Sequence, residues 1–340
     1  MTPTDASRVL SGITPSGPLT LGNYLGALKR FVDGQGSQQG YFFIADLHAL
    51  TTPSVHGRVR ELTLQTSALY FAAGLDPEPS TVFVQSHVRA HVDLAYLLES
   101  TAYVGELGRM IQFKEKGGRP RTRASLFTYP CLMAADILLY DARRVPVGGD
   151  QGQHVELCRD LAVRFNRDYG ETFVVPELAP AALATRVADL ADPTVKMSKS
   201  APDAAADVVR MLDGPEVVRR KVARALTDSD GEVRYDPAEK PGVSNLLDIL
   251  ATVAGGDPDQ VAAEFTSYGS LKSAVADAVI EVLEPIQRRY AALRADEPGL
   301  GAILALGAER ASRQAEPVVQ RAKRAMGLLL PAPRGQSTSA

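Results

Sequence analysis

Apolar and polar positions in the first third of the chain follow two alternating patterns. Residues 41–45 and 81–84, which are apolar except for Thr81, are each followed by polar residues, which is typical of buried parallel strands. Between them, residues 58–73 repeat apolar side chains with a helical period, and Gly74 stands where helices often end. Strand, helix and strand in succession predict a parallel sheet covered by helices, that is, an α/β fold.

The remaining segments are mostly helical in pattern. Helices are expected at residues 24–31, 91–103, 109–116, 127–140, 157–169, 245–253, 271–283, 286–293 and 302–328. Pro130 is assigned to the first turn of its helix, and Ser244 is assigned as the N-cap of the helix at 245–253. Residues 117–123 form a basic loop and residues 176–180 a connector. After residue 200 no further apolar strand pattern occurs, so a separate helical domain is predicted.

Composition narrows the class of protein. The 340 residues suggest about two domains. A net charge of −3 excludes a general polycation, so any nucleic acid must be held by local patches. No apolar run reaches the roughly 20 residues of a membrane span, and residues 1–7 lack an apolar signal core. Cys131 and Cys158 have no zinc-type spacing. We therefore expect a cytoplasmic protein with no structural metal and no membrane contact.

A glycine-rich stretch at residues 11–26 links a short apolar run to a helix. In this layout backbone N–H groups and a helix N-terminus face an anion. Asn23 could cap the helix or bind a nucleotide. The spacing is neither Gly-x-Gly-x-x-Gly nor that of a phosphate-binding P-loop, and such a stretch is structural more often than functional.

A second motif changes this interpretation. The pentapeptide Lys196-Met197-Ser198-Lys199-Ser200 resembles the phosphate-contacting loop of class I aminoacyl-tRNA synthetases. The tetrapeptide Thr20-Leu21-Gly22-Asn23 then resembles the variant of their first signature found in tryptophanyl-tRNA synthetases. A lone Lys-x-x-Lys pair is common on solvated surfaces, but the two motifs together, in this order, are specific. The chain resembles a bacterial tryptophanyl-tRNA synthetase from about residue 8 to about residue 328.

This resemblance implies a domain plan and an activity. Residues 1–200 would form a Rossmann-like catalytic domain for ATP and tryptophan, 201–290 a helical tRNA anticodon-binding domain, 291–330 helices packing back on the catalytic domain, and 331–340 a disordered tail. The implied enzyme is a tryptophan–tRNA ligase. It would use ATP with Mg²⁺ to form tryptophanyl-adenylate, transfer the acyl group to the terminal adenosine of tRNA(Trp), and act as a homodimer.

Asp136 is the strongest candidate for selecting the amino acid. It lies inside an almost wholly apolar helix, where an isolated carboxylate costs several kcal/mol unless it is paired or hydrogen-bonded. It is either a structural residue, bonded to backbone or an arginine, or an acceptor for a ligand. The indole N–H of tryptophan only donates, so a buried carboxylate suits it.

The resemblance carries further roles to matching residues. The catalytic residues would be Lys196, Lys199, Lys116 and Asn23. The ATP-binding residues would be Thr14, Ser16, Gly22, Asn23, Gly148, Asp150, Lys196, Met197 and Lys199. The tryptophan-binding residues would be Asp136, Tyr129, Met133, His48, Val145, Val147, Gln151 and Leu10. Within the last set, Tyr129 and Gln151 would hold the α-ammonium group, while Met133, Val145 and Val147 would pack on the ring.

Three residues depart from the family pattern. Thr14 replaces a common Gln, Leu10 replaces a bulkier or aromatic side chain, and Gly149 replaces a Glu. The first two lie beside the expected substrate sites. Altered affinity for tryptophan, as in a second, inhibitor-resistant copy of the enzyme, is therefore a hypothesis.

Three other functions stay open. A tyrosyl-type synthetase shares the fold, although a phenol both donates and accepts and would need paired polar groups. A synthetase-like binding protein without catalysis has no need of both motifs. A nucleotidyltransferase of related fold would not need the long helical region after residue 200.

Overall fold

The computed structural model describes residues 8–37, 39–147, 152–180, 186–199, 201–202 and 204–331. The strands are β1 (Arg8–Ile13), β2 (Gln39–Ile44), β3 (Ser80–Val84), β4 (Arg144–Val147) and β5 (Glu177–Pro180). The first helices are α1 (Leu21–Asn23), the π-helical turn η1 (Tyr24–Leu28), α2 (Lys29–Gly34), α3 (Asp46–Ala49), α4 (Val59–Ala72), α5 (Ala90–Glu99), α6 (Val104–Leu107), α7 (Ile111–Lys116) and α8 (Ala124–Leu138). The later helices are α9 (Gly152–Tyr169), α10 (Pro215–Ala223), α11 (Pro241–Ala254), α12 (Pro258–Ala262), α13 (Tyr268–Ala295) and α14 (Glu297–Ala325).

The chain divides into two compact units, each discontinuous in sequence. Unit 1 takes in Met1–Ser11, Phe83–Ala181 and Ala305–Ala340, and unit 2 takes in Gly12–Val82 and Ala182–Leu304. The division falls within β1, β3 and α14. The predicted functional domains, with a boundary at residue 200, stay a prediction.

The strands form two small sheets. β1, β2 and β3 are neighbours in that order, and β4 pairs with β5 in parallel, with Val145 opposite Leu178. Gly12 of β1 faces the ring of Phe43 in β2, where an added Cβ would lie only 2.7 Å from ring atoms. A side chain at position 12 would therefore displace the aromatic ring. Among the described residues no strand follows β5, so the predicted α/β part followed by helices is confirmed.

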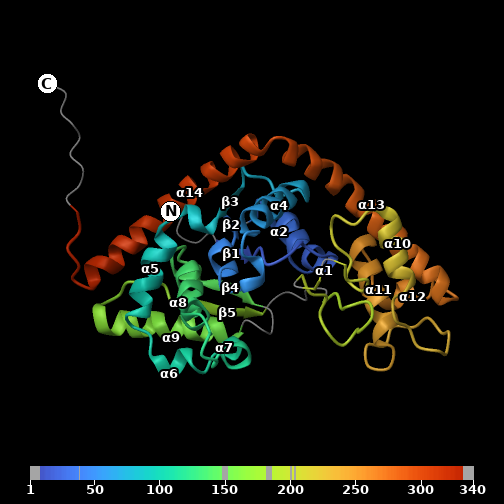
Figure 1. The fold of residues 1–340 in the computed structure, drawn as a ribbon, viewed down its shortest axis with the longest axis horizontal. Coiled ribbons are helices and arrows are strands. Elements are labelled where there is room, and N and C mark those ends of the chain that lie inside the picture. Colours follow the sequence, from blue (N-terminus) through green and yellow to red (C-terminus); the bar gives the residue numbers. More distant parts are fainter. Residues whose placement is uncertain are drawn as a thin grey trace. The chain divides into compact units, whose positions relative to one another are not determined.

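Helices surround these strands within each unit. In unit 1, α8 packs against α5 and α9, and α9 contacts the β4–β5 pair, as Figure 1 shows. In unit 2, α13 packs against α4, α10 and α11. The predicted helix end at Gly74 is confirmed, since Gly74 follows α4 with a φ of 111°. No helix in the described part of the chain is both long and apolar enough to cross a membrane.

Four local predictions are wrong. The two helices expected at 271–283 and 286–293 are one helix, α13, which continues through Pro285. Pro130 lies inside α8 rather than in its first turn, and packing of that helix between two others offsets the missing N–H. Residues 177–180 are the strand β5 rather than a connector. Ser244 is not an N-cap: α11 begins at Pro241, after Lys240, and the Ser244 hydroxyl instead accepts a hydrogen bond from the backbone N–H of Asp236.

Candidate active site

The glycine-rich segment ends in a capping box at the start of α1. Thr20 is the N-cap, and its Oγ1 accepts from the backbone N–H of Asn23 at 3.2 Å. The backbone N–H and the hydroxyl of Thr20 both lie 3.1 Å from Oδ1 of Asn23. Thr20, not Asn23, therefore caps the helix. Because Oδ1 faces these donors, the side-chain amide of Asn23 is held in one orientation, with its Nδ2 hydrogens left as donors for a ligand.

The lysine pentapeptide that begins at Lys196, here called the lysine motif, packs against the glycine-rich stretch in unit 2. Met197 is only 1% exposed, and a Cβ added at Gly22 would lie 3.4 Å from the Met197 Cβ. The backbone N–H of Met197 donates to the carbonyl of Val187 at 3.1 Å, and Lys196 pairs with Ala188 in an antiparallel bridge. The second motif therefore lies within van der Waals distance of the first signature at Gly22.

Lys199 bonds the lysine motif directly to the glycine-rich stretch. Its Nζ donates to the carbonyl oxygen of Thr14 at 2.7 Å. Burial, with a smaller contribution from the charge of Lys196, lowers the pKa of Lys199 to about 8. The ammonium group of Lys199 is thus charged at neutral pH, but its partner Thr14 offers only a neutral carbonyl. An anion such as a phosphate would stabilise the buried charge.

Asp136 belongs to a buried hydrogen-bond network in unit 1. It is 3% exposed, and its Oδ1 accepts from Nε2 of Gln85 at 2.7 Å and from Nδ1 of His91 at 2.6 Å. The other ring nitrogen of His91 lies 2.9 Å from the hydroxyl of Tyr140. With Nδ1 donating to the carboxylate, Nε2 of a neutral ring accepts from that hydroxyl. The network of Gln85, His91 and Tyr140 fixes the orientation of the carboxylate through side-chain hydrogen bonds.

Tyr129 and Met133 lie on the same face of α8 as Asp136, since their spacing is that of successive helical turns. Both are half-buried. The hydroxyl of Tyr129 is hydrogen-bonded to Nε2 of His154 on α9, and burial raises the pKa of Tyr129 to about 12. Tyr129 therefore stays a neutral phenol, able to donate or accept, at any physiological pH.

The predicted site residues fall into two groups. Unit 2 contains Thr14, Ser16, Gly22, Asn23, His48, Lys196, Met197 and Lys199. Unit 1 contains Leu10, Lys116, Tyr129, Met133, Asp136, Val145 and Val147. Gly148, Gly149, Asp150 and Gln151 lie outside the described residues. The ATP group is thus largely gathered in unit 2 and the tryptophan group in unit 1, with His48 and Lys116 as the exceptions.

Individual residues in these groups differ in accessibility. Lys116 is exposed at the end of α7, where its Nζ donates to Gln112 at 2.7 Å. Leu10 and Val145 are buried strand residues, each 6% exposed. His48 is half-buried on the short helix α3. Of these side chains, only Lys116 and His48 are accessible without rearrangement.

The sequence interpretation missed Gln85 and His91. Both are fully buried. Gln85 directly follows β3, whereas His91 lies at the start of α5. Open α/β sheets bind ligands at the carboxyl ends of their strands. The position of Gln85 could therefore have predicted a role in the site. No pattern in the sequence linked either residue to Asp136.

Within the described residues, no group of three or more His, Cys, Asp or Glu side chains is arranged to hold a metal ion. The cations near the first signature include Lys199, which bonds the carbonyl of Thr14, and Arg210, which pairs with Thr20. This half of the site is therefore suited to an anion that brings its own cation.

The contact between the lysine motif and the glycine-rich turn, in one compact unit, defines a nucleotide-binding α/β protein with both class I synthetase signatures. Comparison with known proteins narrows this class. The family described as tRNA synthetases class I (W and Y) matches residues 2–284. The chain belongs to this family.

Its relatives match over nearly their whole length. Tryptophan–tRNA ligase 1 of Streptomyces coelicolor is 52% identical over 332 residues, which cover 96% of this chain and 98% of that protein. The crystal structure of tryptophanyl-tRNA synthetase from Mycoplasma pneumoniae matches with a TM-score of 0.86 at 33% identity, covering 95% of this chain and 98% of that one. The Campylobacter jejuni enzyme complexed with ADP and tryptophan has a TM-score of 0.80 at 31% identity, covering 94% and 100%. The predicted family and fold class are confirmed.

Proposed function

We propose that this chain activates L-tryptophan with ATP and transfers it to tRNA(Trp). The observation that carries the proposal is the hydrogen bond from Lys199 to Thr14, which joins the lysine motif to the glycine-rich stretch that holds the first signature. A tryptophan–tRNA ligase that is 52% identical over nearly the full length supports the same activity. In the first step a carboxylate oxygen of tryptophan attacks the α-phosphorus of ATP, the bond to the β-phosphate breaks, and pyrophosphate leaves.

The residues of unit 2 would serve the triphosphate. The Nζ of Lys199 carries three N–H donors, so one can remain on Thr14 while the others reach phosphate oxygens. Lys196 is exposed beside it and adds a second mobile charge. Asn23 offers the Nδ2 donors that its capping box leaves over. These groups stabilise charge that develops on the leaving pyrophosphate, and no protein nucleophile is needed.

The residues of unit 1 would select the amino acid. Asp136, oriented by His91 and Gln85, accepts the indole N–H. Tyr129 and Met133 share its helix face, where they line the ring and the α-ammonium group. A ligand without an indole N–H would leave the buried carboxylate without that donor, and such a mismatch is strongly penalised.

The second step uses the terminal adenosine of tRNA(Trp). Its 2′-hydroxyl oxygen attacks the acyl carbon of the adenylate, and AMP leaves. We assign residues 201–290 to holding the anticodon arm and place the enzyme in the cytoplasm as a homodimer. ATP would arrive with Mg²⁺ on its phosphates, so the metal is part of the substrate and Lys116 is the additional cation offered to them.

Amino-acid-dependent exchange between ATP and labelled pyrophosphate tests the first step. The wild type and Asp136→Asn are assayed with each of the twenty amino acids, and folding of the variant is checked by circular dichroism. We expect exchange with tryptophan alone, because only its side chain pairs a large apolar ring with an N–H donor. Asn keeps the shape but removes the charge, so exchange should fall steeply in the variant.

Other results point to other functions. Exchange with tyrosine would keep the fold and overturn the substrate. A folded protein that binds ATP but exchanges with no amino acid would favour a non-catalytic synthetase-like binding protein. Charging of a tRNA(Trp) transcript then tests the second step.

A further inference from the structure

Arg210 connects the segment after the lysine motif to the glycine-rich turn. Its Nη2 donates to the carbonyl oxygens of Ala201 at 2.9 Å and Pro202 at 2.8 Å. Its Nη1 donates to the carbonyl of Pro18 at 3.4 Å. Residues 201 and 202 directly follow the lysine motif, and Pro18 lies two residues before the start of the first signature at Thr20. One guanidinium thus bonds the backbone on both sides of the proposed triphosphate site.

The backbone of Arg210 is held on the same structure. Residue 210 pairs with Thr20 in an antiparallel bridge, and the flanking hydrogen bonds run from Leu21 N–H to Val209 and from Met211 N–H to Leu19, at 2.8 and 2.9 Å. The side chain therefore starts beside the N-cap of α1, so its reach to both partners is set by the backbone rather than by a flexible loop.

This arrangement is costly for a residue with only a packing role. Arg210 is 7% exposed, and its side-chain hydrogen bonds in the described residues, which omit 200 and 203, all go to backbone carbonyls. Its Nε has no hydrogen-bond partner in that same set. A buried cation with neutral partners is harder to accommodate than an apolar side chain of equal size. A function that needs its three-carbonyl geometry explains its presence.

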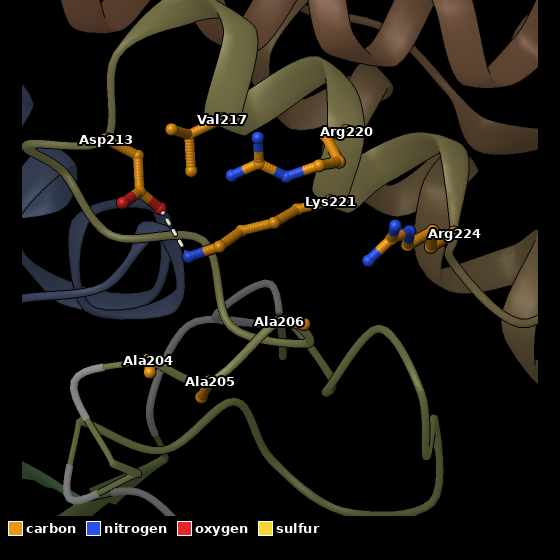
Figure 2. Close-up of a pocket in the computed structure, with 8 residues that line it drawn as sticks. All are labelled: Ala204, Ala205, Ala206, Asp213, Val217, Arg220, Lys221 and Arg224. Atoms are coloured by element: carbon orange, nitrogen blue, oxygen red, sulfur yellow. Dashed lines mark hydrogen bonds and ion pairs between the residues drawn. The ribbon is translucent and has the colours of Figure 1, made fainter.

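A second set of contacts anchors Arg210 to the helices of unit 2. Oδ2 of Asp213 accepts from the backbone N–H of Arg210 and from Nζ of Lys221, each at 2.8 Å. Figure 2 shows this ion pair, with Lys221 reaching from α10 to Asp213 along one wall of a pocket. The Nζ of Lys221 also donates to the carbonyl of Val208 at 2.7 Å. Gln287 on α13 donates to the carbonyls of Met211 and Asp213, both at 2.9 Å.

We propose that Arg210 is a positioning residue for the activation step. It holds the segment after the lysine motif against the glycine-rich turn, so that Lys199 meets the triphosphate in one geometry. This positioning role rests on the proposed function. Arg210 itself lies outside both signature motifs. Lys199 supplies charge to the reacting phosphates, whereas Arg210 acts on them only through the backbone that it holds.

The test compares Arg210→Met, Arg210→Lys and the wild type in tryptophan-dependent pyrophosphate exchange. Met keeps most of the side-chain volume and loses every donor. Lys keeps the charge but cannot reproduce the planar fork. Arg220→Ala is the matched control, since Arg220 lies beside Lys221, lines the same pocket (Figure 2) and is exposed. No hydrogen bond or ion pair joins Arg220 to any other described side chain.

We expect kcat of Arg210→Met to fall between about 10-fold and 100-fold, as misplacement of a catalytic group does. The KM for tryptophan should stay at the wild-type value. The kcat of Arg210→Lys should lie between those of the wild type and Arg210→Met. Without substrates, trypsin should release the fragments that end at Lys196 or Lys199 faster in Arg210→Met. Arg220→Ala should match the wild type in every measurement.

The outcomes separate this role from the activity itself. Wild-type kcat in both Arg210 variants would overturn the positioning role alone. A fall in kcat would also overturn the positioning role if trypsin released the fragments at the wild-type rate, because the lysine motif would then still be held in place. If Arg210→Met does not fold, Arg210→Lys decides by the same two readouts. A wild type without exchange would remove the proposed function, and the role with it.

Discussion

Lys199 and Thr14 are joined by a hydrogen bond of 2.7 Å across 185 residues of chain. A backbone carbonyl carries only a partial negative charge, so it does not replace the hydration that the ammonium group loses. Burial and the neighbouring Lys196 together lower the pKa of Lys199 to about 8. The glycine-rich stretch thus holds Lys199 in place, and the poorly compensated charge favours binding of a phosphate by the N–H donors that Thr14 does not use.

The pH dependence of ATP use follows from this pKa. A lysine is charged below its pKa, so kcat/KM for ATP should be level below pH about 8 and fall up to about tenfold per pH unit above it. Pyrophosphate exchange at saturating tryptophan, measured from pH 6.5 to 10, gives the profile. Arg stays charged throughout this range, so Lys199→Arg should lose the inflection near 8. The same inflection in both proteins would assign it to another group.

Recognition of the indole should depend on His91. His91 donates to Oδ1 of Asp136, as Gln85 also does, and a hydrogen bond to a charged group contributes about 1.5–3 kcal/mol. His91→Leu should therefore raise the KM for tryptophan about 10-fold to 100-fold with the KM for ATP unchanged. His91→Asn, whose amide can still donate, is the matched control and should lose less. An equal rise in both KM values would point to general disruption of unit 1.

The capping box links stability to activity. Thr20 is fully buried, and its hydroxyl takes part in both directions of the box. Thr20→Val keeps the shape without the hydroxyl and should lower the free energy of unfolding by about 0.5–2 kcal/mol. Activation should also slow, because the Asn23 amide loses its fixed orientation. Thr20→Ser retains the hydroxyl and should recover most of the activity. Urea unfolding and pyrophosphate exchange on the same preparations make the comparison.

The departure at Thr14 should affect inhibition. A Thr side chain is shorter than the Gln that the family commonly has at this place and carries no amide donor. Tryptophan analogues built on indole are therefore expected to bind this protein more weakly than they bind a homologue with Gln. Thr14→Gln should lower the inhibitory concentration of an indole antibiotic about 10-fold, the effect of roughly one hydrogen bond. Equal sensitivity of the two proteins would remove the hypothesis of a resistant copy.

Local chemistry determined what the sequence could predict. The apolar runs at 41–45 and 81–84 became β2 and β3, because period and β-propensity act over a few neighbouring residues. The end of α4 was predictable because only glycine adopts the φ of 111° at Gly74 without strain. The two signature motifs were recognisable for the same reason, since each is contiguous. They were enough to assign the fold class and the family.

Tertiary structure decided which residues meet. Gln85 and His91 reach Asp136 from 51 and 45 positions away, and Arg210 reaches Pro18 across 192. No local pattern encodes such contacts, because they depend on how whole elements pack. Packing also overrode local preference where the prediction failed, at Pro130 inside α8 and at Ser244 inside α11. The sequence by itself determined the elements and the chemical groups, whereas the orientation of Asp136, the pKa of Lys199 and the contacts of Arg210 depend on desolvation and distance, which only the folded chain sets.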